Sequence, residues 1–103
     1  MTVEGRGRLL VPLDGSLPGG DALGAASAVG DLADADLDVI YVSDPPVATA
    51  EVARRAQIPD DWLGRVRLHS ADGEAGEAIV RSARQLGVRA IVLSSHGETR
   101  NLA

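Results

Sequence analysis

The chain has 103 residues, the size of one small domain, and 45% of them are hydrophobic, so the composition supports a single buried core. A net charge of −5 argues against a protein that binds the nucleic-acid backbone. The absence of cysteine excludes disulfides and thiolate sites, and the absence of lysine excludes a P-loop lysine and a Schiff-base lysine. No apolar run approaches the ~20 residues of a membrane helix, and the N-terminus has no signal-peptide core. We therefore expect a cytoplasmic protein that binds neither nucleic acid nor membrane.

The first half of the chain predicts two strands separated by a helix. Arg8–Leu13 is a continuous apolar run, which is typical of a strand buried on both faces of a parallel sheet, and turn residues follow it. Alanines and valines at helical spacing predict a helix over 18–33. The β-branched run Asp38–Val42 predicts the second strand.

The second half continues the alternation. It predicts a helix over 47–57 that breaks at Ile58-Pro59, an edge strand at Arg65–His69, a helix at Glu74–Leu86 and a fourth strand at Ala90–Leu93. Gly87 is placed to end the third helix as a C-cap. Strands that alternate with helices predict an α/β fold, with an open parallel sheet and helices on both faces, in one domain over residues 1–103.

Several charged residues invite functional interpretations that their context does not support. Asp34, Asp36 and Asp38 have the spacing of a calcium loop, but the glycine and glutamate that such a loop needs are absent. Arg67 alternates with apolar neighbours and fits the solvent face of a strand, and His69 lies on the same strand with no catalytic role. No Gly-x-Ser-x-Gly elbow presents a serine nucleophile, so a hydrolase triad is rejected.

Four segments, in order and at matching spacing, resemble the universal stress protein family. They are "LLVPLDGS", "DALGAA" after it, "VIYVSDPP" and "GEAGEAIVRSARQLGVRAIVLSSHG", and together they extend over nearly the whole chain. The resemblance implies a Rossmann-like sheet of strand order 3-2-1-4-5. The family's last helix and fifth strand have no counterpart here, so we expect the order 3-2-1-4 and a C-terminally incomplete domain. In the ATP-binding branch of this family, adenine nucleotide binds at the carboxyl ends of the first and fourth strands.

The resemblance also implies a set of nucleotide-binding residues. The expected set is Pro12, Leu13, Asp14, Val42, Leu93, Ser94, Ser95, His96, Gly97 and Thr99. Asp14 matches the acidic residue near the ribose and the metal-bound phosphates, so it is also the candidate Mg²⁺ ligand. From its sequence alone, Asp14 fits an ordinary turn or N-cap aspartate equally well.

The phosphate loop departs from the family pattern in two ways. Ser94 stands where the family has its first glycine, and the Gly-Ser or Gly-Thr pair beyond Gly97 has no counterpart. The resemblance therefore leads to two hypotheses. The first is a stress-response module that binds ATP, or a related adenine nucleotide, as a regulatory ligand, with at most slow hydrolysis. The alternative is a member of the same fold that binds no nucleotide and acts as a dimerisation or protein-interaction module. Both are expected to form a homodimer.

Overall fold

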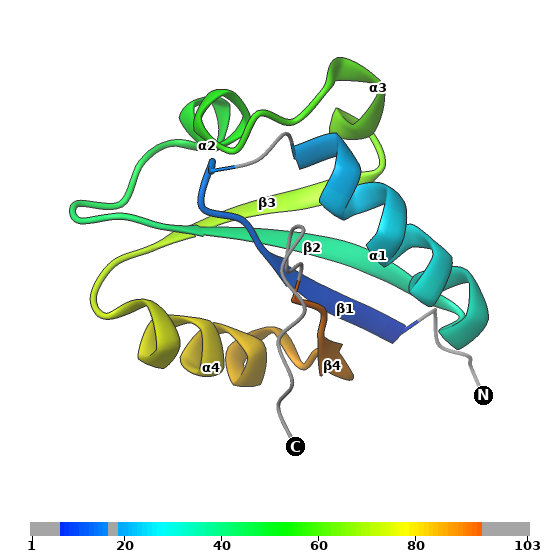
Figure 1. The fold of residues 1–103 in the computed structure, drawn as a ribbon. Helices are drawn as coiled ribbons and strands as arrows, with labels where there is room; N and C mark the ends of the chain where they lie inside the picture. Colours follow the sequence, from blue (N-terminus) through cyan, green and yellow to red (C-terminus); the bar gives the residue numbers. More distant parts are fainter. Residues whose placement is uncertain (1–6, 17–18, 94–103) are drawn as a thin grey trace.

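The computed structural model describes residues 7–16 and 19–93, which form a four-stranded sheet with helices on both sides (Figure 1). The elements in chain order are β1 (Gly7–Pro12), α1 (Gly19–Ala33), β2 (Ala35–Val42), α2 (Thr49–Arg55), α3 (Asp60–Leu63), β3 (Val66–Ala71), α4 (Ala75–Leu86) and β4 (Ala90–Ile91). All strand pairs are parallel and the sheet order is β3-β2-β1-β4. The predicted fold class and strand order are confirmed.

The two faces of the sheet are covered differently. The main core lies on one face, where Leu9, Val11, Leu37 and Val39 pack against α1 and against Ala56 and Ile58 of the segment around α2 and α3. α4 lies on the opposite face, and it is the one helix that crosses that side in the described part of the chain (Figure 1). Side chains alternate along a strand, so Arg8, Leu10, Asp38 and Ile40 project to the face that carries α4.

The element boundaries differ from the sequence predictions at every strand: β1 is shifted by one residue, β3 runs to Ala71 and not to His69, and β2 and β4 differ more. The short helix α3 was not predicted. β2 begins at Ala35, three residues earlier than expected, because its register with β1 starts at the pair Gly7 and Ala35. β4 is limited to Ala90 and Ile91, although the Val92 amide still donates to Leu10 O at 2.8 Å. The edge position predicted for the third strand is confirmed, since β3 pairs with β2 alone among the described strands. None of the helices in the described ranges has the length and apolarity needed to cross a membrane.

Two glycines give a matched pair of stability predictions. Gly87 ends α4 in the left-handed region, at φ 69°, whereas Gly24 lies inside α1, and an added Cβ would meet nothing within 4 Å at either position. Gly87→Ala is expected to lower the free energy of unfolding by about 1 kcal/mol, because a Cβ disfavours that conformation. Gly24→Ala is expected to raise it by about 0.5–1 kcal/mol, because alanine favours the helix. Urea denaturation of both variants measures this; changes of the same sign would contradict it.

Candidate functional site

The carboxyl ends of β1 and β4 meet at the point where the chain changes direction across the sheet. From β1 the chain passes through α1 to β2 on one side, and α4 returns it from β3 to β4 on the other side (Figure 1). Open α/β sheets bind ligands in the crevice outside the carboxyl ends of their strands at such a switch point. Here that edge is formed by Leu13–Ser16 after β1 and by Val92 and Leu93 after β4.

The described part of the loop after β1 is ordered by its own hydrogen bonds and by one from Gln57, just beyond α2. Asp14 Oδ1 accepts from the Ser16 amide at 2.9 Å and from the Ser16 hydroxyl at 2.6 Å, which closes an Asx turn. Gly15, at φ 81°, takes a conformation that favours glycine, and its carbonyl accepts from Gln57 Nε2 at 2.7 Å. The loop is thus built before any ligand binds, with the carboxylate of Asp14 on the exposed side.

The end of β2 lies beside this loop. Leu13 donates its amide to Ile40 O at 3.0 Å, which continues the β1–β2 pairing past the last strand residue of β1. Val42 is the last residue of β2 and is half-buried, and the Ser43 amide after it donates to Ala71 O at 2.9 Å. Of the predicted nucleotide-binding residues, Pro12, Leu13, Asp14, Val42 and Leu93 therefore lie at one edge of the sheet. Ser94, Ser95, His96, Gly97 and Thr99 lie outside the described residues.

The arginines of α2, near the same loop, are engaged with a carboxylate. Glu51 accepts from Arg54 and from Arg55, the latter at 2.7 Å. Hydrogen bonds from Arg54 and Arg55 lower the pKa of Glu51 to about 2, so this carboxylate is ionised throughout the physiological range. A ligand phosphate near α2 would have to compete with Glu51 for these guanidinium groups.

The described side chains are suited to Mg²⁺ only when the ion is also bound by the phosphates of a ligand. No group of three or more potential ligand side chains is clustered in the described part of the chain. Mg²⁺ keeps several waters and is commonly bound by one or two carboxylates together with substrate phosphates. Asp14, at the end of β1, could supply one such carboxylate to an ion held mainly by phosphate oxygens.

Sequence reasoning missed a buried ionic cluster on the α4 face of the sheet. Asp38 is fully buried, with Arg8 Nε 2.5 Å from its Oδ2 and His69 Nε2 2.9 Å from its Oδ1. Arg8 Nη2 reaches Oδ1 at 3.2 Å and donates to Leu37 O at the same distance, and Arg67 Nε lies 3.8 Å from Oδ1. The cluster joins β1, β2 and β3 across the sheet.

The electrostatics of Asp38 favour a structural role for this cluster. Burial raises the pKa of Asp38, but the hydrogen bonds and charges of Arg8 and His69 outweigh burial and hold that pKa below its ordinary value. A carboxylate kept ionised by two partners is a poor proton donor or acceptor near neutral pH. The sequence carries only a partial signal: Arg67 and His69 alternate along the predicted third strand, and an aspartate precedes the apolar run of the second. The register that brings them together is known only from the structure.

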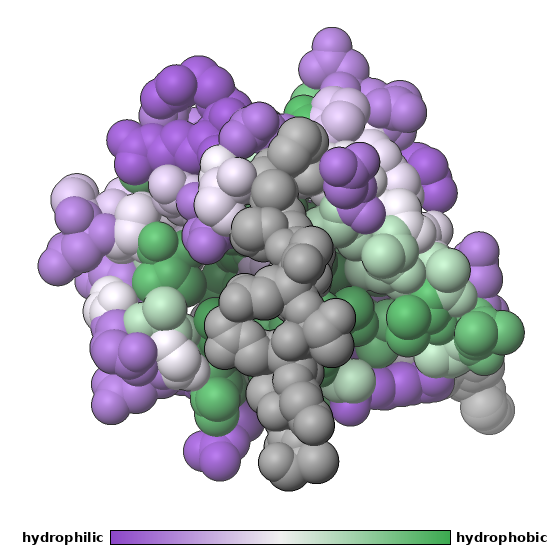
Figure 2. Space-filling view, viewed as in Figure 1, coloured by the Kyte–Doolittle hydropathy of each residue, from purple (hydrophilic) through white to green (hydrophobic). Residues whose placement is uncertain are grey.

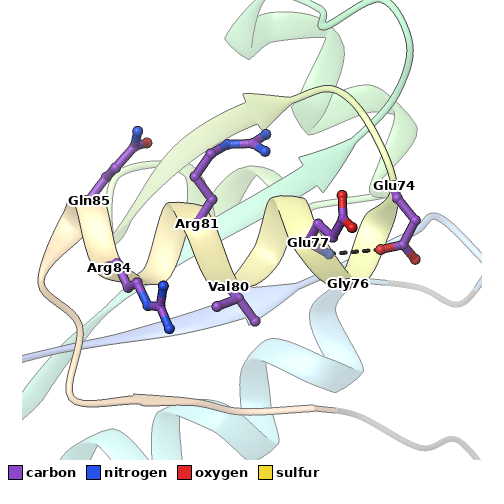
Figure 3. Close-up of a pocket in the computed structure, with 7 residues that line it drawn as sticks. All are labelled: Glu74, Gly76, Glu77, Val80, Arg81, Arg84 and Gln85. Atoms are coloured by element: carbon purple, nitrogen blue, oxygen red, sulfur yellow. Dashed lines mark hydrogen bonds between the residues drawn. The ribbon is translucent and has the colours of Figure 1, made fainter.

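A shallow, open hollow of about 630 Å³ lies along the outer face of α4 (Figure 3). Its described lining residues all come from this helix and its N-cap: Glu74, Gly76, Glu77, Val80, Arg81, Arg84 and Gln85. Glu74 caps the helix, since its Oε1 accepts from the Glu77 amide at 2.8 Å. None of the five predicted nucleotide-binding residues that the structure describes lines this hollow.

Comparison with known proteins leaves the family of the chain as a hypothesis. No protein-family model matches the sequence, and a search of curated proteins returns no significant match.

Proposed function

We propose that the chain is a universal-stress-type domain that binds ATP or a related adenine nucleotide as a regulatory ligand. The nucleotide would lie across the carboxyl ends of β1 and β4, with Mg²⁺ between its phosphates and Asp14. The proposed role is in a cytoplasmic stress response, with at most slow hydrolysis of the nucleotide.

One observation carries this proposal: the two segments that resemble the family's nucleotide-binding strands are adjacent in the sheet. β1, which leads into "LDGS", pairs in parallel with β4, which leads into "VLSSHG", although some 80 residues separate them along the chain. The Asx turn at Asp14 adds support, because it holds the carboxylate at that edge before a ligand arrives. A pre-formed loop lowers the entropy that binding must overcome.

Nucleotide-dependent melting tests the proposal. We expect Mg²⁺-ATP at about tenfold above its Kd to raise the Tm by about 5 °C or more, because a ligand that binds only the folded state stabilises it by mass action. Asp14→Asn retains the side-chain oxygen that accepts from Ser16 but loses the negative charge, so it is expected to weaken Mg²⁺-ATP binding roughly tenfold.

The matched control is Asp31→Asn, which removes the same charge from an exposed position near the C-terminal end of α1. This variant is expected to bind Mg²⁺-ATP like the unaltered chain. An unchanged Tm at millimolar Mg²⁺-ATP would refute nucleotide binding, and equal losses in both variants would remove Asp14 from the site.

A second candidate function is protein interaction without nucleotide. It is favoured by exposed apolar side chains on and beside the α4 face, since Val80, Ile91 and Leu93 are 45%, 37% and 67% exposed. Self-association on gel filtration, together with an unchanged Tm in ATP, would select this function over the first.

A further inference from the structure

The outer face of α4 carries charges that have no partner within the described chain. Glu77 and Arg84 lie on this face and form no ion pair with any residue in 7–16 or 19–93. Arg81 is partly engaged, because its Nη2 donates to Asp72 O at 3.1 Å. Val80 lies between the two unpaired charges and is 45% exposed.

These residues are arranged so that the face is complementary to itself. Glu77 and Arg84 are seven residues apart, which places them two turns, or about 10 Å, apart along one side of the helix. Glu77 and Arg84 are equally far along the sequence from the midpoint between Val80 and Arg81. Gly76 and Gln85 are also equally far from that midpoint, so a two-fold axis through it would exchange the members of each pair between two copies. In an antiparallel pair of α4 helices related by a two-fold axis, Glu77 of each copy therefore faces Arg84 of the other.

Apolar surface lies beside the charges. Val80 and Arg84 point to the side of α4 along which the chain of β4 runs (Figure 3). Ile91 of β4 is in register with Leu10, so it projects to the α4 face of the sheet, and it is 37% exposed. The space-filling view shows hydrophilic and hydrophobic side chains mixed over α4, with hydrophobic ones beside β4 and also toward the end of α1, whereas the region of α2 is mostly hydrophilic (Figure 2).

The outer face of α4 is better suited to self-association than the rest of the surface because it carries no net charge, whereas the chain as a whole is acidic. The chain carries a net charge of −5, so two copies repel each other over most approaches. The outer face of α4 has two acidic residues, Glu74 and Glu77, and two basic residues, Arg81 and Arg84, and is formally neutral. Two copies that meet here bring opposite charges together without adding to the general repulsion.

We propose that the occupant of the α4 face is a second copy of this chain, packed with its α4 antiparallel to the first. Each dimer contains two Glu77–Arg84 pairs, one at either end of the contact, and the Val80 side chains lie between them. Ile91 adds apolar area at the margin. One helix and a short strand bury less than the ~1,600 Å² of a standard interface, so the dimer is expected to be reversible. It does not depend on nucleotide.

Charge reversal tests the pairing directly. In sedimentation equilibrium over a concentration series, the unaltered chain is expected to dimerise. Glu77→Arg and Arg84→Glu are each expected to raise the dissociation constant about tenfold or more, since like charges then face each other at both ends. The double variant E77R/R84E is expected to restore the dimer, and so is an equimolar mixture of the two single variants, where opposite charges again meet across the axis.

Rescue separates this interface from an effect on folding. Each reversal places an unfavourable charge in an end turn of α4 and so lowers the stability of the fold. In the double variant these two losses of stability add, so an effect on folding would weaken the dimer further, whereas the proposed pairing restores it. Asp31→Arg on α1 is the control, expected to leave the dimer unchanged. If circular dichroism shows that a reversal variant is unfolded, the milder variants Glu77→Gln and Arg84→Gln are used in its place. A monomer at all concentrations, single variants that still dimerise, or folded single variants that do not associate when mixed would each overturn the proposal.

Discussion

Asp38→Asn is expected to lower the free energy of unfolding by about 3 kcal/mol, near the lower end of the cost of removing one partner from a buried ion pair. Asp38 is fully buried, and its carboxylate is the shared acceptor for Arg8 and His69. The amide deprives the guanidinium of Arg8, which is only 19% exposed, of its buried counter-charge, and the half-exposed carboxylate of Asp36, 3.7 Å from Arg8 Nη1, is the remaining anionic partner. A domain of this size has a total stability of roughly 5–15 kcal/mol, so the loss is large. Urea denaturation followed by circular dichroism measures it.

A double variant separates the ionic contribution from packing. Arg8→Met combined with Asp38→Leu removes both charges, and we expect it to be closer in stability to the unaltered chain than Asp38→Asn is, because no buried charge is left unpaired. If Asp38→Asn costs less than about 0.5 kcal/mol, which is typical of an exposed surface change, the cluster does not stabilise the sheet.

Low pH is expected to lower the stability of the fold by protonating the carboxylate of Asp38. Because the pKa of Asp38 is lowered in the folded state, its contribution to stability is fully present above the unfolded value of about 3.9. That contribution is lost as the pH falls through the folded-state pKa. Unfolding measured from neutral to acidic pH should therefore show a loss in the unaltered chain below about pH 4 that is smaller in Asp38→Asn.

Gly15→Ala is expected to lower the free energy of unfolding by about 2–3 kcal/mol, because it combines backbone strain with a steric clash. Gly15 has φ 81°, and a Cβ there would lie 2.4 Å from the backbone oxygen of Arg55. Relief of this contact requires α2 to move or the Asx turn to open. Chemical denaturation measures the loss of stability.

The same substitution also tests the pre-organisation of the proposed site. If the β1 loop is part of the nucleotide site, Gly15→Ala also weakens Mg²⁺-ATP binding, whereas Gly87→Ala, at a left-handed glycine far from this loop along the chain, leaves binding unchanged. Wild-type stability in Gly15→Ala would contradict the close contact between this loop and α2.

The fold was predictable because its signals are local. Continuous apolar runs predicted buried parallel strands, and the strand–helix alternation left few arrangements that obey the handedness rule. Gly87 ends α4 in the left-handed conformation that glycine favours, as predicted. The early start of β2 was not predictable from propensity, because Asp34–Asp38 is typical of a polar connection until its pairing with β1 is known.

The ionic cluster could not be predicted from local signals, because it depends on register between three strands. Arg8, Asp38 and His69 are 30 or more residues apart along the chain. Arg67 was predicted to lie at the solvent face and is indeed largely exposed, whereas His69 from the same strand contacts a buried carboxylate. Strand alternation gives the face of each residue, but only pairing decides which side chains meet.

A titration of the ¹⁵N-labelled protein with Mg²⁺-ATP, followed through its amide resonances, tests the central claim most directly. The account predicts that shifts concentrate at the carboxyl edge of the sheet, at Leu13–Ser16, Val42 and Val92–Leu93, with little change along α4. No shifts at millimolar Mg²⁺-ATP, or shifts confined to the arginine-bearing outer face of α4, would contradict it.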